Sequence, residues 1–413
     1  MAIASDNSIQ TNYRTDLVAL RAAETAPYFT VGSKAYIPDS ELVNKRNGQT
    51  YGYVIRSRSE VVNDLVMGVS EKNALVERKV ELTIEPWHDS VKTNAIEGKT
   101  DLQWDKEVAE PEGIALIQGA VKKAIKNDFP KCATCFVGEV GQFEPLSMAS
   151  AHLASITTEP LYGFCDPMIE AIVTSKGAQF VPVDAPAMYK QGLIGHFHGA
   201  DYRSQRFIPR VKIDSVLATA MSGAVFASYS ESAGEGTLTL TLGASPSAAT
   251  VIKAGTPIFL DGIVACDTVG DPTTQPYAFI VKADKAVATT DSTVAVKVDE
   301  VPVSDIGTRV AAFEDGSVID FSDLSTSTAA SIPAAGTYFA AILRANGAYN
   351  FQTLNEIDVA TADSTKGSVQ GVTIFTNRLI DIANMINDTR FDLFTLAGVV
   401  EKRAQALVLV KAK

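Results

Sequence analysis

The first residues to consider for chemistry are the four cysteines, Cys132, Cys135, Cys165 and Cys266. The first two form a C-x-x-C motif. A structural zinc site needs four ligands, and for this motif only His152 or Cys165 could be suggested as further ones. A redox motif opens a helix after a strand, whereas this one follows Pro130 at the end of a predicted helix. We therefore interpret Cys132 and Cys135 as small buried residues.

Two histidines stand two positions apart, which places His196 and His198 on one side of a predicted strand. That spacing suits a metal, but only Asp201 accompanies them, and strong sites bring together three or four ligands. His88 and His152 stand alone. We expect no metal site.

Arg203, Arg206 and Arg210 form a small basic cluster around Tyr202 and Phe207. The cluster fits a solvated loop, a patch between subunits or a contact with nucleic acid. The formal net charge of −12 makes the third reading the weakest. Motifs for nucleotide binding, serine hydrolysis or zinc proteolysis are absent from the sequence. We therefore predict no catalytic residue and no cofactor, and expect that the protein is not an enzyme.

Length and composition describe a folded chain of more than one domain. The 413 residues exceed one compact core, and 46% of them are hydrophobic. Few cysteines for this length favour a reducing compartment. The N-terminus lacks the pattern of a signal peptide, and no apolar run approaches the roughly 20 residues of a membrane helix. We expect a soluble protein that is made in a cytoplasm and has no membrane partner.

The clearest helix runs from Glu110 to Pro130. Pro111 suits a first helical turn, and Glu110 and Glu112 suit the positive end of the helix dipole. Apolar residues share one face: Ile114, Ile117, Val121, Ala124 and Ile125. The opposite face is polar: Gln118, Lys122, Lys123 and Lys126. Pro130 is expected to end the helix.

Before this helix, the sequence predicts an arm and a long β-excursion. Residues 16–25 form a short helical pattern within an N-terminal arm. Alternation predicts two strands, one with Tyr51, Tyr53 and Ile55 and the other with Val80, Leu82 and Ile84. The two runs lie far apart, with little apolar sequence between them. Because an isolated hairpin is only marginally stable in water, we expect this excursion to pack against another surface, such as a neighbouring subunit.

After the helix, the pattern is that of an α+β body. We predict helices at 146–153 and 166–175, the second with Asp166 as its N-cap, Pro167 in its first turn and its end before Gly177. Strands are predicted at 180–183, 193–198, 349–359 and 406–410, with 391–400 leading into the last. A further helix is predicted at 376–386, because Leu379, Ile380 and Ala383 have helical spacing.

Residues 226–340 differ in texture and predict a small β-barrel or sandwich inside this body. Strand patterns occur at 237–242, 257–260, 277–281 and 293–298. Asp261-Gly262 is a hairpin-turn signal after the second, and a proline-rich turn, 271–276, precedes the third.

The order of these parts resembles the HK97-type fold of tailed-phage major capsid proteins, and more narrowly the coat proteins of short-tailed Salmonella phages, whose body carries an inserted β-barrel. Six stretches carry the resemblance. Residues 75–84 match the returning extended loop, 112–127 the spine helix, 161–168 a strand and helix start with Asp166 where Asn is common, 237–260 the first hairpin of the barrel, and 349–359 with 391–410 the closing strands.

The resemblance implies an α+β, HK97-like capsid fold with an inserted all-β barrel domain. Its parts would be an N-terminal arm (1–30), an extended β-loop (31–86), a peripheral region with the spine helix (87–145), the first part of an apical domain (146–225), the inserted barrel (226–340) and the apical and peripheral completion (341–413). The expected contacts between subunits involve charged side chains: Lys72, Arg78, Lys79, Glu81, Lys122, Lys126, Arg203 and Arg206.

The implied function is a coat protein whose hexamers and pentamers form an icosahedral head around double-stranded DNA. Scaffolding protein and portal are the expected partners, and the expected location is the virion capsid, assembled in the host cytoplasm. Alternatives are an encapsulin-like nanocompartment shell, a β-rich decoration protein or adhesin, and an enzyme of unrecognised type. Some relatives cross-link lysine to asparagine between subunits, with Lys45, Lys72, Lys79, Asn350 and Asn355 as candidates here. Nothing in the sequence marks the acidic catalyst, so we predict no cross-link.

Overall fold

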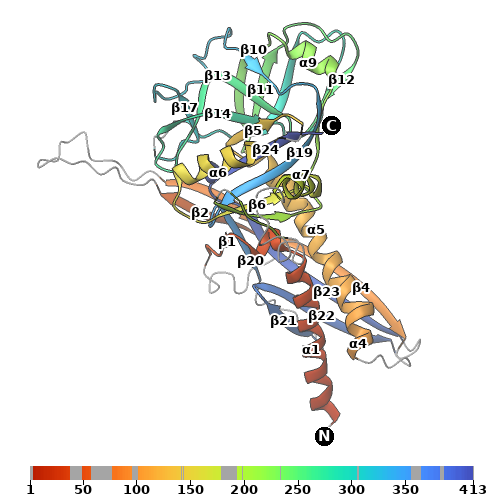
Figure 1. Ribbon diagram of the computed structural model, residues 1–413. Helices are drawn as coiled ribbons and strands as arrows, with labels where there is room; N and C mark the ends of the chain where they lie inside the picture. The colour runs from red at the N-terminus through yellow and green to blue at the C-terminus, as the bar shows by residue number, and fades with distance from the viewer. Residues whose placement is uncertain are drawn as a thin grey trace, which may run out of the picture. The chain divides into compact units, whose positions relative to one another are not determined.

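The computed structural model shows a mixed α+β, strand-rich chain in two compact units (Figure 1). Unit 1 comprises Met1–Tyr53, Val80–Ala124 and Tyr349–Gly398, and unit 2 comprises Val54–Lys79, Ile125–Ala348 and Val399–Lys413. The structure describes residues 3–37, 49–56, 77–94, 101–140, 142, 144–177, 193–197, 199–232, 234–304, 307–354, 364–381 and 386–412.

Unit 1 is built on a six-stranded sheet in the order β1-β20-β23-β22-β21, with β4 also paired to β23. The strands are β1 (Ser33–Lys34), β4 (Glu85–Asn94), β20 (Tyr349–Thr353), β21 (Ser364–Val369), β22 (Val372–Asp381) and β23 (Ile386–Val399). The β21-β22-β23-β4 part is antiparallel, and β1 runs parallel to β20. A separate two-stranded ribbon joins β2 (Thr50–Arg56) to β3 (Glu77–Thr83), as the alternation predicts.

Two long helices cover one face of the antiparallel strands. The helix α1 (Ile3–Glu24) lies on β21 and β22, where Thr15 Oγ1 is 2.8 Å from Thr365 Oγ1 and 3.0 Å from Thr376 Oγ1. The helix α5 (Glu110–Asp128) lies along β4, where Trp87 faces Gly119. A short helix, α2 (Pro27–Thr30), follows α1. The helical arm predicted at 16–25 is confirmed and is longer than expected.

The predicted central helix is confirmed as α5, which begins at Glu110 with Pro111 in its first turn, but helical structure also precedes it. Its axis starts with α4 (Asp101–Trp104) and continues through a π-helical turn, Asp105–Ala109, into α5. Proline inside a helix removes one hydrogen bond and crowds the carbonyl four residues earlier. The π turn, in which the Glu110 N–H donates to Asp105 O, falls directly before Pro111 and widens the helix there. After Asp128 the chain continues as a 3₁₀ turn, Phe129–Lys131.

Glycine allows α1 to approach its neighbours closely. A Cβ atom at Gly113 of α5 would lie 2.7 Å from Val18 O, and one at Gly367 of β21 would lie 2.6 Å from the Thr15 carbonyl carbon. Both distances are shorter than a Cβ contact permits. The backbone of α1 therefore touches α5 on one side and β21 on the other only because these two positions lack side chains.

Unit 2 is built on an 11-stranded sheet in the order β17-β13-β14-β5-β24-β19-β6-β8-β7, with β18 also paired to β13 and β9 to β19. The strands are β5 (Thr134–Gly138), β6 (Leu161–Cys165), β7 (Leu193–Phe197), β8 (Ala200–Ser204), β9 (Val211–Ile213), β13 (Pro257–Cys266), β14 (Pro272–Ile280), β17 (Ala311–Phe313), β18 (Ala330–Ser331), β19 (Gly336–Ala345) and β24 (Gln405–Lys411). A 3₁₀ turn, Lys402–Ala404, precedes β24.

Helices α6 (Glu144–Ile156) and α7 (Pro167–Gly177) pack on this sheet, as predicted. Their apolar residues share one core with alternate residues of β19 and β24: Leu146, Leu153, Ile169, Ala341, Leu343, Val408 and Val410 are among its members. The predicted N-cap is confirmed, because Met168 N donates to Asp166 Oδ1 at 2.8 Å. Gly177 is the last residue of α7 and does not lie beyond it.

The strand-rich segment predicted at 226–340 is mostly β-structure. Besides β13, β14, β17 and β18 it holds β10 (Val225–Ser232), β11 (Glu235–Thr241) and β16 (Thr293–Asp299) in a three-stranded sheet, and β12 (Thr250–Ile252) paired with β15 (Lys285–Val287). A short helix, α9 (Ser215–Met221), precedes it. In register, β14 meets β5 at Tyr277 and Thr134 alone. The strands β17, β13 and β14 of this segment are thus the end of the 11-stranded sheet, and β14 connects them to β5.

The helix predicted at 376–386 is wrong. The segment is strand β22 and the first residue of β23, with residues 382–385 outside the described chain. The prediction was based on the helical spacing of Leu379, Ile380 and Ala383 in the sequence. β22 hydrogen-bonds to a strand on both sides, and its β-branched residues Thr373, Ile374 and Thr376 favour an extended backbone.

Two predicted turns and one hairpin are also wrong. Asp261-Gly262 lies inside β13, where Gly262 has a φ of +76° and the pairing register shifts between Phe259 and Val264. The Asp-Gly pair therefore makes a β-bulge, not a hairpin turn. The proline-rich stretch 271–276 mostly belongs to β14. Residues 237–260 are not a hairpin, because β11 pairs with β10 and β16.

Candidate functional site

The lysine row of α5 is on the surface, as predicted. Lys122, Lys123 and Lys126 are exposed, and the opposite face is buried at Ile117, Val121 and Ile125. Ile114, Ala124 and Gln118 are half-buried. The helix therefore presents a basic outer row and an apolar inner row.

Two lysines of this row have partners within the chain. Lys123 Nζ lies 2.7 Å from Glu85 Oε1 and 5.8 Å from the centre of the Trp87 ring, so it ties α5 to β4. Lys126 acts on Asp284, whose pKa is held below its usual range first by the hydrogen bond from Lys253 and, more weakly, by Lys126. The two predicted contact residues of this row, Lys122 and Lys126, are both exposed, and Lys126 also acts on Asp284 within the chain.

The β2–β3 ribbon carries part of the predicted contact set. Lys79 and Glu81 are exposed on β3, and Arg78 lies between Glu77 and Lys79 on the same strand. Lys72 lies outside the described residues. At the root of the ribbon, Leu82 and Ile84 are buried in one cluster with Ile37, Leu354 and Leu396 of unit 1.

The arginine cluster around β8 and the segment that follows it is partly neutralised. Arg210 Nε lies 3.1 Å from Asp166 Oδ2, and its guanidinium lies 5.0 Å from the centre of the Phe339 ring. Arg203 is half-buried and Arg206 is exposed. Only Arg206 of the two predicted contact residues here is fully presented at the surface of the chain.

The thiols are shielded. Cys132, Cys165 and Cys266 are buried and Cys135 is half-buried, and all four are free. Burial raises the pKa of each thiol, to about 11 for Cys266 and further for the others. The interpretation of the C-x-x-C pair as small core residues agrees with this.

Across the described ranges, no group of three or more His, Cys, Asp and Glu side chains is placed to hold a metal ion. His196 lies on β7, and His198 falls outside the described residues. Asn350 is fully buried, accepts from Tyr36 N at 3.0 Å and donates to Leu396 O at 2.9 Å.

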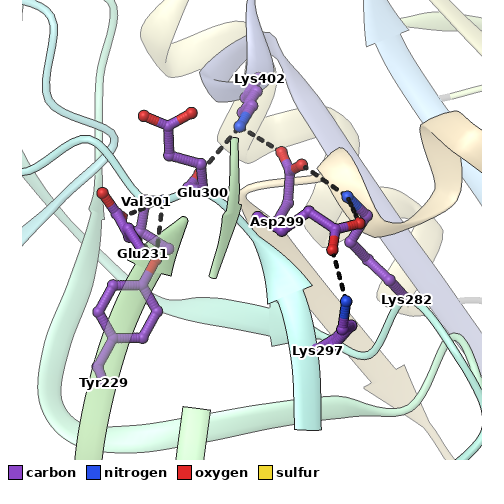
Figure 2. A network of polar contacts seen from close by, with 9 residues as sticks. Tyr229, Glu231, Lys282, Lys297, Asp299, Glu300, Val301 and Lys402 are labelled. Atoms are coloured by element: carbon purple, nitrogen blue, oxygen red, sulfur yellow. Dashed lines mark hydrogen bonds and ion pairs between the residues drawn. The ribbon is translucent and has the colours of Figure 1, made fainter. Parts of the chain in front are cut away.

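A polar network that the sequence did not predict fastens the strand-rich segment to the C-terminal part of unit 2 (Figure 2). Lys402 forms an ion pair with Asp299 at the end of β16 and donates to Glu300 O at 2.9 Å. Both side chains of the ion pair are largely shielded, with 16% of Lys402 and 9% of Asp299 exposed. Lys282 Nζ reaches Asp299 Oδ1 at 3.8 Å, on the side opposite Lys402.

The network continues along the strands of the segment. Glu235 on β11 binds Lys297 at 2.9 Å and Lys282 at 3.2 Å, and these hydrogen bonds, Lys297 first, lower the pKa of the carboxyl. Beside it, Tyr229 donates to Glu231 Oε1 at 2.6 Å, and the N–H of Val301 reaches the same carboxylate at 3.1 Å (Figure 2). Burial, followed by Glu231, raises the pKa of the Tyr229 hydroxyl.

Arg403, next to Lys402, makes a second connection. Its guanidinium binds both carboxylate oxygens of Glu401 at 2.8 Å and donates to Gly307 O at 3.2 Å. Arg309 in turn donates to Gly270 O at 2.7 Å and Gly316 O at 2.9 Å. Two consecutive cations of the segment before β24 thus anchor the loops of residues 226–340. Apart from Glu401, their partners lie some hundred positions earlier in the sequence, so no local motif marks these contacts.

No family model matches the chain, and no curated protein matches it either. Solved structures similar to it are phage capsids. The capsid of Ralstonia phage GP4 is 7% identical with a TM-score of 0.44, covering 89% of this chain and 85% of that one. The head of Helicobacter pylori phage KHP40 is 7% identical with a TM-score of 0.41, covering 94% and 91%. The capsid of cyanophage P-SCSP1u is 8% identical with a TM-score of 0.40, covering 92% and 86%. At these values the likeness establishes neither a family nor a function.

None of the helices in the described ranges is both long enough and apolar enough to span a membrane.

Proposed function

We propose that this chain is a phage major capsid protein with an HK97-like fold, which self-assembles into the icosahedral head shell that encloses double-stranded DNA. The observation that carries the proposal is the build of unit 1. A 19-residue helix lies along an antiparallel sheet, and a two-stranded ribbon is rooted in the core of the same unit. This combination agrees with the spine helix and extended loop that the sequence resemblance implies.

The ribbon supports a role in assembly, because within the described ranges no third strand pairs with β2 or β3. Two strands without a third, or without a covering helix, are marginal in water. Val54 is 40% exposed and Lys79 and Glu81 are exposed, so both apolar and charged groups are presented along it. A neighbouring copy that covers these side chains would supply the missing surface. The exposed Lys122 of α5 is the contact proposed for the opposite partner, together with Arg206.

The strand-rich segment fits an inserted domain that strengthens its own subunit. Lys402 and Arg403 directly precede β24 of the 11-stranded sheet. Their contacts with Asp299 and Gly307 fasten residues 226–340 to that strand. The domain boundaries given above, hexamers and pentamers as the assembly units, a scaffolding protein, a portal and a virion location all belong to this proposal. No catalytic step is part of it.

Electron microscopy of the full-length chain, expressed alone and with its genomic neighbours, tests the proposal. We expect uniform closed particles tens of nanometres across. Particles that contain a protein cargo and no DNA would indicate a nanocompartment shell instead. A chain that remains monomeric under all these conditions, or binds to the outside of finished particles, would contradict the proposal.

A further inference from the structure

An acidic pair lies between α5 and β4, on the covered face of the unit 1 sheet. The cross-strand register places Asp89 in one row with Phe391 and Thr376, whose side chains face the helices. Alternate β4 residues meet α5 in sequence: Glu85 binds Lys123, Trp87 faces Gly119, and Asp89 bonds to Glu112. Two carboxyl groups thus meet where a helix packs on a strand.

The pair holds a proton near neutral pH. Burial, then the charge of Asp89 and the hydrogen bond with it, raise the pKa of the Glu112 carboxyl to about 7. Glu112 Oε2 is shielded from solvent, and no donor among the described residues reaches it. Asp89 Oδ1 accepts from Ser90 N at 2.8 Å. A protonated Glu112 carboxyl can donate to Asp89, whereas an ionised one cannot.

The charges around the pair are engaged elsewhere. From α1, Arg14 lies over the Trp104 ring and Arg21 binds Asp105 at 2.8 Å. From β4 and α5, Glu85 and Lys123 bind each other. The β23 residues that face this layer, Thr389 and Phe391, do not ionise. What opposes the Glu112 charge is thus its burial and its neighbour Asp89.

We propose that one proton shared by Glu112 and Asp89 fastens α5 to β4, and that its loss above neutral pH loosens this joint. Two carboxylates at hydrogen-bond distance repel each other once both are ionised. A carboxyl that titrates higher in the folded chain than in the unfolded chain stabilises the fold at low pH. That stability is fully present below about pH 4.5 and is lost as the pH rises through about 7.

The chain contains its own probe for this joint. Its two tryptophans are Trp87 and Trp104. Trp87 contacts α5, and Trp104 lies 6.4 Å from Phe391, centre to centre. Tryptophan emission during urea unfolding of the unassembled full-length chain therefore reports unit 1, and the outcome does not depend on whether shells form.

Between pH 5.5 and 8.5, we expect the urea midpoint of the wild type to fall and its unfolding constant to rise about tenfold or more, since one pKa unit is one factor of ten. Glu112→Gln keeps the shape and a hydrogen bond to Asp89 but cannot ionise, so most of this pH dependence should disappear. Glu110→Gln is the matched control, because Glu110 is exposed on the same helix. It should behave as the wild type does.

The half-buried His152 cannot imitate the result, because desolvation lowers its pKa and so makes stability rise with pH. If Glu112→Gln folds poorly, Asp89→Asn replaces it, since it removes the repulsion from the other side and should also flatten the profile. An unchanged pH dependence in either variant would overturn the proposal, as would a wild-type midpoint that does not fall above neutral pH.

Discussion

Lys402 and Lys297 form ion pairs in the same network that should contribute very differently to the stability of the fold. Lys402 meets Asp299 where both side chains are largely shielded, whereas Lys297 and Glu235 are 62% and 41% exposed. When one partner of an exposed ion pair is removed, water solvates the remaining charge, so the pair contributes little to stability. A shielded carboxylate that loses its cation has no such substitute. Lys282 remains as the second, more distant cation for Asp299.

Lys402→Met should therefore lower the free energy of unfolding by about 2–3 kcal/mol, somewhat less than for an isolated buried pair because Lys282 stays. Lys297→Met, its matched control, should cost less than about 1 kcal/mol. Urea unfolding followed by circular dichroism measures both. Equal effects of the two substitutions would show that the Lys402 connection does not hold the segment in place.

The four thiols should be poorly reactive in the native chain. Burial keeps each in its protonated form at neutral pH, and the thiolate is the reacting species. An aromatic disulfide reagent at pH 7.5 should label the native protein at least about a hundredfold more slowly than the protein in urea. Rapid labelling of Cys132 or Cys135, identified by mass spectrometry, would revive a redox role for the motif.

At this scale the sequence indicated local relations and missed distant ones. The Asp166 cap needs only its neighbours Pro167 and Met168, and it was predictable. The network around Lys402 was not, because a lysine in a short connection carries no mark of an aspartate about a hundred positions earlier. The same holds for Glu112, which the sequence suggested only as an acidic residue near a helix start.

Among the elements, α5 shows what a helix needs besides an apolar face. Its inner row was predictable from spacing, but the close approach of α1 at Gly113 was not. Glycine costs a helix about 1 kcal/mol relative to alanine. Its presence here is explained by the 2.7 Å that would separate a Cβ atom from Val18 O.

Gly113→Ala should thus destabilise unit 1 by about 2 kcal/mol, despite the better helix propensity, because the backbone of α1 must move away. Ala115→Gly, at an exposed position of the same helix, gives the cost of glycine alone, about 1 kcal/mol. Tryptophan emission in urea measures both variants. A Gly113→Ala chain as stable as the wild type would mean that α1 and α5 are less closely packed than described.

Strand β22 shows where periodicity fails. Leu379 and Ile380 have helical spacing, yet the segment lies in the interior of a sheet. A central strand is fixed by hydrogen bonds to a strand on each side, here β21 before it and β23 after it, and the spacing of its own apolar residues does not show these bonds. The bulge at Gly262 is a similar case, since Asp-Gly favours a turn locally while the strand pairing continues through it.

For the whole molecule, the proposed assembly predicts that surface charge matters more for particles than for folding. Lys122→Glu/Lys126→Glu reverses exposed charges on α5 and should leave the unfolding free energy within about 1 kcal/mol of the wild type. Assembly should be strongly reduced, because a neighbour that complements a basic row would now be repelled. Electron microscopy and sedimentation measure this.

Lys253→Glu serves as the comparison, because Lys253 is also an exposed lysine but lies outside α5 and is not among the predicted contact residues. It should affect assembly little. Normal shells from the doubly reversed variant would contradict the interface assigned to α5, and would leave the fold of the chain unaffected.

Strand β24 lies between β5 and β19 near the middle of the large sheet, yet it follows every other strand of that sheet in the sequence. Its Leu407, Val408 and Leu409 are fully buried. During synthesis, the ribosome therefore delivers the central strand of this sheet last. Until then, the edges of β5 and β19 that pair with β24 have unpaired backbone groups, which can associate with other chains. We expect such a chain to depend on chaperones until synthesis passes β24.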